Sequence, residues 1–163
     1  MNKQLLNEAI KCLAIRDVIL AETSVSVKKE YDPIYSPFNE ISVQFRSGVT
    51  GAEGKTYEDS DSGTQVKLIV FTYECAFRLL PPAVLGDKSN SEEHMKAETL
   101  MEAIATFRAY YTHENDISED AVNEFMKYNV GYHVWPYWRE YASSIAMRVR
   151  LPSFSVPFYR VPE

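Results

Sequence analysis

VWPYWREYASSIAMRVRLPSFSVPF, residues 134–158, joins an apolar helical stripe to an extended tail that is punctuated by prolines. Pro152 separates the two parts, because a proline cannot continue a helix. The stripe recurs at intervals of three and four residues, which is the spacing of a helix that buries one face: Val134, Trp138, Tyr141, Ala142, Ile145 and Val149. The segment therefore predicts a long helix that ends near residue 150, followed by an extended chain.

A second helix is predicted directly before the long one. The spacing of Asp116 and Glu119 is that of a capping box, and the apolar period behind it predicts a helix over residues 117–128. After a short interruption the long helix should begin around Tyr132 or Pro136.

Four segments earlier in the chain show the two-residue period of β-strands, with one face apolar. The first carries an irregularity near Ala21, which predicts a bulge. A short amphipathic helix is predicted before it, over residues 3–13. The predicted strands cover residues 15–27, 41–46, 69–79 and 101–111.

The connections between these strands are polar and irregular, which favours an antiparallel sheet over crossover helices. Residues 47–64 are rich in Gly, Ser, Asp and Glu and predict a flexible connection, and residues 86–96 predict another polar connection. The expected class is α+β: a four-stranded antiparallel sheet with a C-terminal helical layer on one face and a short N-terminal helix. We expect one domain over residues 1–163.

Charge and composition exclude several classes of partner. The net charge is -6 at pH 7 and no block of Lys and Arg is present, so phosphate backbones would be repelled and no nucleic acid partner is expected. Lys and Glu interrupt the apolar residues at the N-terminus, and no apolar run reaches the roughly 18 residues of a membrane span. We expect a cytoplasmic protein with no membrane association, in which Cys12 and Cys75 are free thiols.

Several short motifs resemble catalytic or ligand-binding sites but lack the required spacing. GKT at 54–56 follows glycines, yet five residues separate Gly48 from the GK pair where a phosphate-binding loop has four, and no helix is predicted after it. DSDSG at 59–63 resembles a calcium loop, but Val70 stands where the closing Glu belongs. The three histidines are well separated, and Cys75 would lie on a core face, where burial raises the pKa of a thiol. We expect no catalytic residue, no metal and no cofactor.

The order of elements, together with residues 136–152, resembles the SecB family of export chaperones. It is most similar to the SecB-like chaperones of toxin-antitoxin-chaperone systems. The resemblance covers about residues 14–161, and most of its specificity lies in the last forty residues. Its matching residues open the first strand, start the long helix and end it: Ile15, Arg16 and Asp17; Pro136, Tyr137, Arg139, Glu140 and Tyr141; Arg148, Leu151 and Pro152.

The resemblance implies a chaperone that holds unfolded or partly folded polypeptide without ATP, with an antitoxin C-terminal segment as its client. Such a protein needs adaptable apolar and aromatic grooves rather than a preorganised polar site. Two alternatives stay open: a general SecB-type export chaperone, and an adaptor that binds one folded partner. General export SecB continues past the tail into a further helix and a segment that docks on SecA. This chain stops at Glu163, so docking on SecA is not expected.

The resemblance also assigns candidate residues. In SecB-like proteins the connection between the first two strands borders the client groove, and here residues 28–40 carry Tyr31, Ile34, Tyr35 and Phe38. The alternative is a loop folded onto its own domain. Further candidates for client contact are Phe45, Trp135, Phe154 and Phe158.

In the family, strands pair across subunits and the long helices pack between the resulting sheets in a dimer of dimers. The resemblance therefore implies a homo-oligomer. The residues expected to lie in the core or at the subunit contact are Trp138, Tyr141, Ile145 and Val149.

Overall fold

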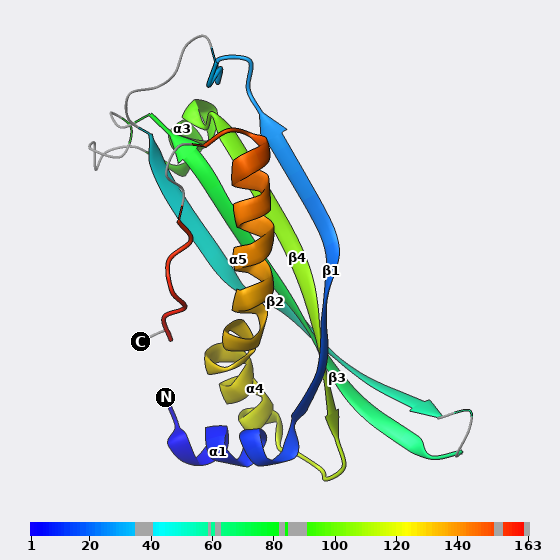
Figure 1. Cartoon of the computed structure of the whole chain (residues 1–163). Coiled ribbons are helices and arrows are strands. Elements are labelled where there is room, and N and C mark those ends of the chain that lie inside the picture. Colours follow the sequence, from blue (N-terminus) through cyan, green and yellow to red (C-terminus); the bar gives the residue numbers. More distant parts are fainter. Residues whose placement is uncertain are drawn as a thin grey trace.

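A computed structural model describes residues 1–34, 41–58, 60, 63–81, 84, 91–151 and 155–161. Its four strands form one antiparallel sheet in the order β1-β4-β3-β2, so that β3 and β4 are central and β1 and β2 are the edges. The strands are β1 (Ala14–Val27), β2 (Ser42–Glu58), β3 (Gln65–Leu80) and β4 (Met101–His113). The predicted α+β class with a four-stranded antiparallel sheet is confirmed (Figure 1).

The prediction of a flexible connection over residues 47–64 is wrong for most of its length. Strand β2 continues to Glu58 and pairs with β3 from Ser47 opposite Cys75 to Glu58 opposite Gln65, with one register shift between Val49 and Gly51. The end of this hairpin projects away from the helices, so its side chains lie mostly in water (Figure 1). Apolar alternation marks a strand with one buried face, and a strand with both faces exposed lacks that signal.

Two irregularities bend β1. The register with β4 shifts between Leu20 and Glu22, which confirms the bulge predicted near Ala21, and a second shift lies between Ile15 and Asp17. Each extra residue reverses the face to which the following side chains point. The bulges therefore decide which residues of β1 face the helices.

The helices are α1 (Lys3–Cys12), α3 (Glu92–Glu98), α4 (Glu119–Tyr128) and α5 (Val130–Arg148). Helix α3 overlaps residues 86–96, for which we predicted a polar connection without a helix. Ser91 caps it by accepting a hydrogen bond from the amide of His94, and Glu92 and Glu93 favour its first turn through the helix dipole.

The start of α4 also differs from the prediction, because the cap is Ser118 and not Asp116. The Ser118 hydroxyl accepts a hydrogen bond from the amide of Ala121. Helix α5 then begins at Val130, with only Asn129 between the two helices. Pro136 therefore lies inside α5 and not at its start.

Helix α5 crosses the face formed by β3 and β4, and α4 continues this layer toward the lower end of the sheet (Figure 1). The strand side chains that point to the helices form the core with them. The ring of Phe77 packs on Trp138, and Phe125 of α4 packs edge-on against Tyr111. The fully buried positions of α5 follow a four-residue interval: Val130, Val134, Trp138, Ala142 and Ala146.

Helix α1 packs against α4 at the same end of the molecule (Figure 1). The carboxylate of Glu8 accepts hydrogen bonds from the hydroxyl (2.8 Å) and the amide (3.3 Å) of Ser118. Ala9 is fully buried in this contact. The side chain that caps α4 is thus itself held by α1.

Candidate functional site

The C-terminal segment Ser155 to Val161, which we call the tail, lies along α5 on the side of β2 (Figure 1). Val156 is buried and only 3% exposed. The indole Nε1 of Trp135 donates a hydrogen bond to the carbonyl oxygen of Pro157 (2.9 Å). The tail therefore binds α5 as an extended polypeptide.

Aromatic rings surround the second part of the tail. The ring of Tyr159 lies 5.4 Å from Trp135 and 6.4 Å from Tyr132, measured between ring centroids. The guanidinium of Arg139 lies 5.0 Å from the centroid of Phe158, a cation-π distance. Phe158 is otherwise 79% exposed. The surface of α5 thus offers ring faces, one cation and one hydrogen-bond donor to an extended chain.

A cavity of about 430 Å³ borders Tyr159. Burial raises the pKa of Tyr73 to about 12, so its hydroxyl stays neutral. The cavity lies between the tail, β2 and α4 and is lined by Ser47, Gly48, Val49, Tyr73, Asn123, Met126, Lys127, Tyr159 and Arg160.

An apolar strip lies on the other side of α5, along the edge strand. Leu20, Val25 and Val27 are 45%, 43% and 47% exposed, and we call them the β1 shelf. The hydroxyls of Tyr141 and Thr23 are hydrogen-bonded, which joins α5 to the strand beside the shelf. In the register with β4 the shelf lies opposite residues that are buried on the face covered by α5: Phe107, Ala103 and Met101.

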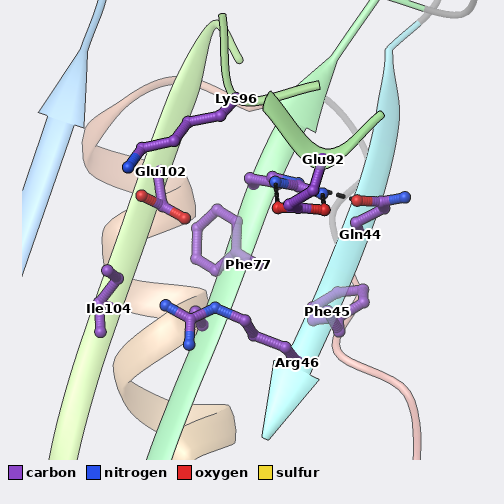
Figure 2. A pocket seen from close by; sticks show the side chains of 10 residues that line it. Gln44, Phe45, Arg46, Phe77, Glu92, Lys96, Glu102 and Ile104 are labelled. Atoms are coloured by element: carbon purple, nitrogen blue, oxygen red, sulfur yellow. Dashed lines mark hydrogen bonds and ion pairs between the residues drawn. The ribbon is translucent and has the colours of Figure 1, made fainter. Parts of the chain in front are cut away.

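A second cavity, of about 470 Å³, has a different chemistry (Figure 2). Arg78 follows Phe77 in β3, so its side chain points to the face opposite α5. It donates hydrogen bonds to Glu92 (2.5 and 3.0 Å) and to Gln44 (2.8 Å). The bond from Arg78 holds the pKa of Glu92 below its ordinary value. This polar network fixes α3 on the sheet, and the cavity is lined by both polar and apolar side chains.

The residues predicted to contact a client occupy different environments. Tyr31 is 6% exposed and its hydroxyl donates to the carbonyl oxygen of Val149 (3.2 Å), so its ring packs inside the chain. Ile34 is 58% exposed. Phe45 is half-buried, with its ring centroid 6.3 Å from that of Phe77. Tyr35, Phe38 and Phe154 lie outside the described residues.

Of these candidates, Trp135 and Phe158 both take part in the contact between α5 and the tail: Trp135 contacts Pro157 and Tyr159, and Phe158 contacts Arg139. The sequence did not single out Tyr159. The sequence Val-Pro-Phe-Tyr could have indicated this residue. A proline breaks the strict alternation of a strand, so that Tyr159 rather than Phe158 can face the helix. Among the residues expected at the core or subunit contact, Trp138 is buried, and the half-buried ones are Tyr141, Ile145 and Val149.

The candidate chemical sites take structural positions instead. Lys55 lies within β2, opposite Leu68, and pairs with Glu53 (2.9 Å). Cys75 is fully buried, and burial raises the pKa of its thiol, as predicted. In the described part of the chain, no group of three His, Cys, Asp or Glu side chains is placed to hold a metal ion. No helix among the described residues has the length and apolar character needed to cross a membrane.

No protein family model matches the sequence, and no curated protein is similar to it in sequence. The solved structures similar to this chain include the Mycobacterium tuberculosis Rv1957 SecB-like chaperone in complex with a ChAD peptide from the Rv1956 HigA1 antitoxin. The match has a TM-score of 0.67 and covers 99% of this chain and 100% of that one. The fold is SecB-like.

The SecB-like fold inferred from residues 136–152 and the order of elements is thereby confirmed. The identity to Rv1957 is 17%, so the likeness is one of fold.

Proposed function

We propose that this chain is an ATP-independent holdase that binds non-native polypeptide, with the antitoxin of a toxin-antitoxin-chaperone system as its dedicated client. The observation that carries the proposal is the tail, an extended proline-containing polypeptide bound by the aromatic surface of α5. The SecB-like Rv1957, which shares the fold, is in complex with an antitoxin peptide. Fold and surface chemistry therefore support the same class of ligand.

The contacts of this surface suit a ligand of variable sequence. The Trp135 indole donates to a main-chain carbonyl, and every residue of a client has one. The rings around Tyr159 contribute dispersion and stacking, which depend on ring area and little on the identity of a neighbouring side chain. Binding of this kind requires neither nucleotide nor a catalytic step.

The working form is a cytoplasmic homo-oligomer, a dimer of dimers. Two features support assembly: in the described residues no strand pairs with the outer edge of β1, and the β1 shelf leaves apolar surface beside it. Unpaired edges and contiguous apolar patches are surfaces that other chains cover. Leu20→Asp should dissociate the assembly, as measured by light scattering after size-exclusion chromatography.

The decisive experiment is suppression of antitoxin aggregation without nucleotide. The unmodified chain should keep a refolding antitoxin in solution, as followed by light scattering. Trp135→Ala should raise the chaperone concentration required by at least about tenfold, since it removes a ring and the hydrogen-bond donor to Pro157 from the centre of the site. Tyr57→Ala is the matched control, because Tyr57 is a 51% exposed aromatic residue on β2 near the projecting hairpin.

Failure of the unmodified chain with both the antitoxin and a generic unfolded protein would remove the proposal. An adaptor for one folded partner is distinguished by competition, because short unfolded aromatic peptides should displace a client from a holdase and leave a folded partner bound to an adaptor.

A further inference from the structure

The tail is attached to α5 in the manner of a bound peptide. Across the described ranges, no backbone-backbone hydrogen bond outside the helices and strands joins residues 155–161 to the rest of the chain. Within the described residues, the hydrogen bond that joins it to the helix is that from Trp135 to Pro157. The segment can therefore leave α5 without breaking a helix or a strand ladder.

Few side chains hold the tail in place. Val156 is 3% exposed and Tyr159 is half-buried, whereas Phe158 and Val161 are 79% and 54% exposed. Two anchors and one hydrogen bond make a weak ligand when it is free in solution. Its attachment to the end of α5 compensates, because a short connection raises the effective concentration to the millimolar range, on the order of 1 mM.

Gly131, inside α5, lies where the helix surface contacts Tyr159 of the tail. We call this surface the seat of the tail. A Cβ at Gly131 would lie 2.6 Å from the hydroxyl oxygen of Tyr73 and 2.7 Å from both the Cε2 atom and the hydroxyl oxygen of Tyr159. Glycine within a helix is unfavourable by about 1 kcal/mol relative to alanine, and a close approach of this kind is a physical reason for it. The helix is thus fitted to an aromatic side chain of the tail.

The site extends beyond the tail. The cavity of about 430 Å³ next to Tyr159 continues between β2 and α4, past Val49 and Met126. It gives a longer extended segment room to bind in continuation of the tail. A client that places rings and a carbonyl where the tail places its own would use the same contacts.

On the basis of the holdase function above, we propose that the tail is an intramolecular competitor of the client. It occupies the α5 surface when no client is bound, and an extended client segment with the tail's chemistry, an apolar residue and proline followed by aromatic residues, displaces it. The tail thereby covers the aromatic surface against non-specific association and sets a threshold of affinity that a client must exceed.

The size of this threshold follows from the bound fraction of the tail. An apparent dissociation constant rises in inverse proportion to the fraction of the protein that is competent to bind. A tail that is seated about 90% of the time weakens client binding about tenfold. Release of the tail should strengthen binding by that factor.

The experiment uses the full chain with the double substitution Val156→Ser and Tyr159→Ser, which removes both anchors of the tail. Val161→Ser is the matched control, because Val161 is an exposed residue of the same segment. Two fluorescent probes are titrated by anisotropy: the free peptide SVPFYRV, which is residues 155–161, and a reduced, carboxymethylated and permanently unfolded protein. Circular dichroism establishes that the double variant is folded, and Tyr159→Ser alone provides a milder release.

The double variant should bind both probes about tenfold more tightly than the unmodified chain, and Val161→Ser should bind like the unmodified chain. The free peptide should also displace the unfolded protein from the double variant. Equal affinity of all variants for the unfolded protein, or a peptide that does not compete with it, would overturn the competitor assignment and leave the holdase function intact. Absence of binding of the unfolded protein to every variant would instead refute the holdase function itself.

Discussion

The substitution Trp138→Ala tests whether this residue belongs to the core of one chain or to a subunit contact. Trp138 is 1% exposed, and its ring centroid lies 6.1 Å from that of Phe77 in β3 and 6.0 Å from that of Tyr141 in its own helix. Each contact is made within one chain. We therefore expect its loss to destabilise the chain independently of assembly.

The magnitude follows from the area involved. A buried tryptophan removes roughly 200 Å² from water, which at about 25 cal/mol per Å² corresponds to about 5 kcal/mol. Substitutions of buried tryptophan or phenylalanine by alanine cost about 3–5 kcal/mol. Because a domain is stable by only about 5–15 kcal/mol, this is a large fraction of the total.

Urea denaturation followed by far-ultraviolet circular dichroism, at two protein concentrations tenfold apart, measures the effect. The decrease in the free energy of unfolding should be about 3–5 kcal/mol at both concentrations. Tyr137→Ala, at a 45% exposed neighbour in the same helix, is the control and should change it by less than about 0.5 kcal/mol. A decrease below about 1 kcal/mol, or one that depends on concentration, would show that the packing of Trp138 has been assigned to the wrong contact.

Three further predictions concern single groups. Because burial raises the pKa of the Cys75 thiol, a thiol reagent at pH 8 should modify Cys12 in the folded chain and both cysteines in urea; modification of folded Cys75 at the rate of Cys12 would contradict its burial. Burial lowers the pKa of His133, whose Nδ1 is hydrogen-bonded to the Tyr111 hydroxyl, so the unfolded state binds the proton more tightly. Stability from the neutral ring is present above the ordinary pKa of about 6.5 and is lost as the pH falls below it, so the melting temperature should fall more steeply from pH 7.5 to 5 in the unmodified chain than in His133→Asn; parallel curves would disprove this. Gly131→Ala should unseat Tyr159 and speed tryptic cleavage after Arg160, whereas Gly54→Ala, with open space around its Cβ, should leave the rate unchanged; equal rates for both variants would count against the fitted seat.

The sequence by itself determined those strands and helices that have one face against the core and the other face in a different environment. The alternation over residues 69–79 and 101–111 and the helical stripe from Val134 to Val149 follow directly from packing against a single core, and they correspond to β3, β4 and α5. Residues 47–58 carried no such signal, since none of them is buried and most of those from Ala52 to Glu58 are exposed. Their strand conformation arises from main-chain hydrogen bonds to β3, which form with most types of side chain and therefore leave little pattern in the sequence.

The candidate site was determined only in part by the sequence. Aromatic residues around 135 and 158 indicated a surface for apolar ligands. Their spacing in the sequence does not predict which of these rings contact one another. Only the tertiary structure placed Trp135, Pro157 and Tyr159 in contact and Tyr31 inside the chain, because the turn after α5 and the packing of each segment depend on contacts between residues far apart in the sequence. Local patterns fix local conformation, whereas the face that a tail or an edge strand presents is decided by the surfaces available to it once the core has formed.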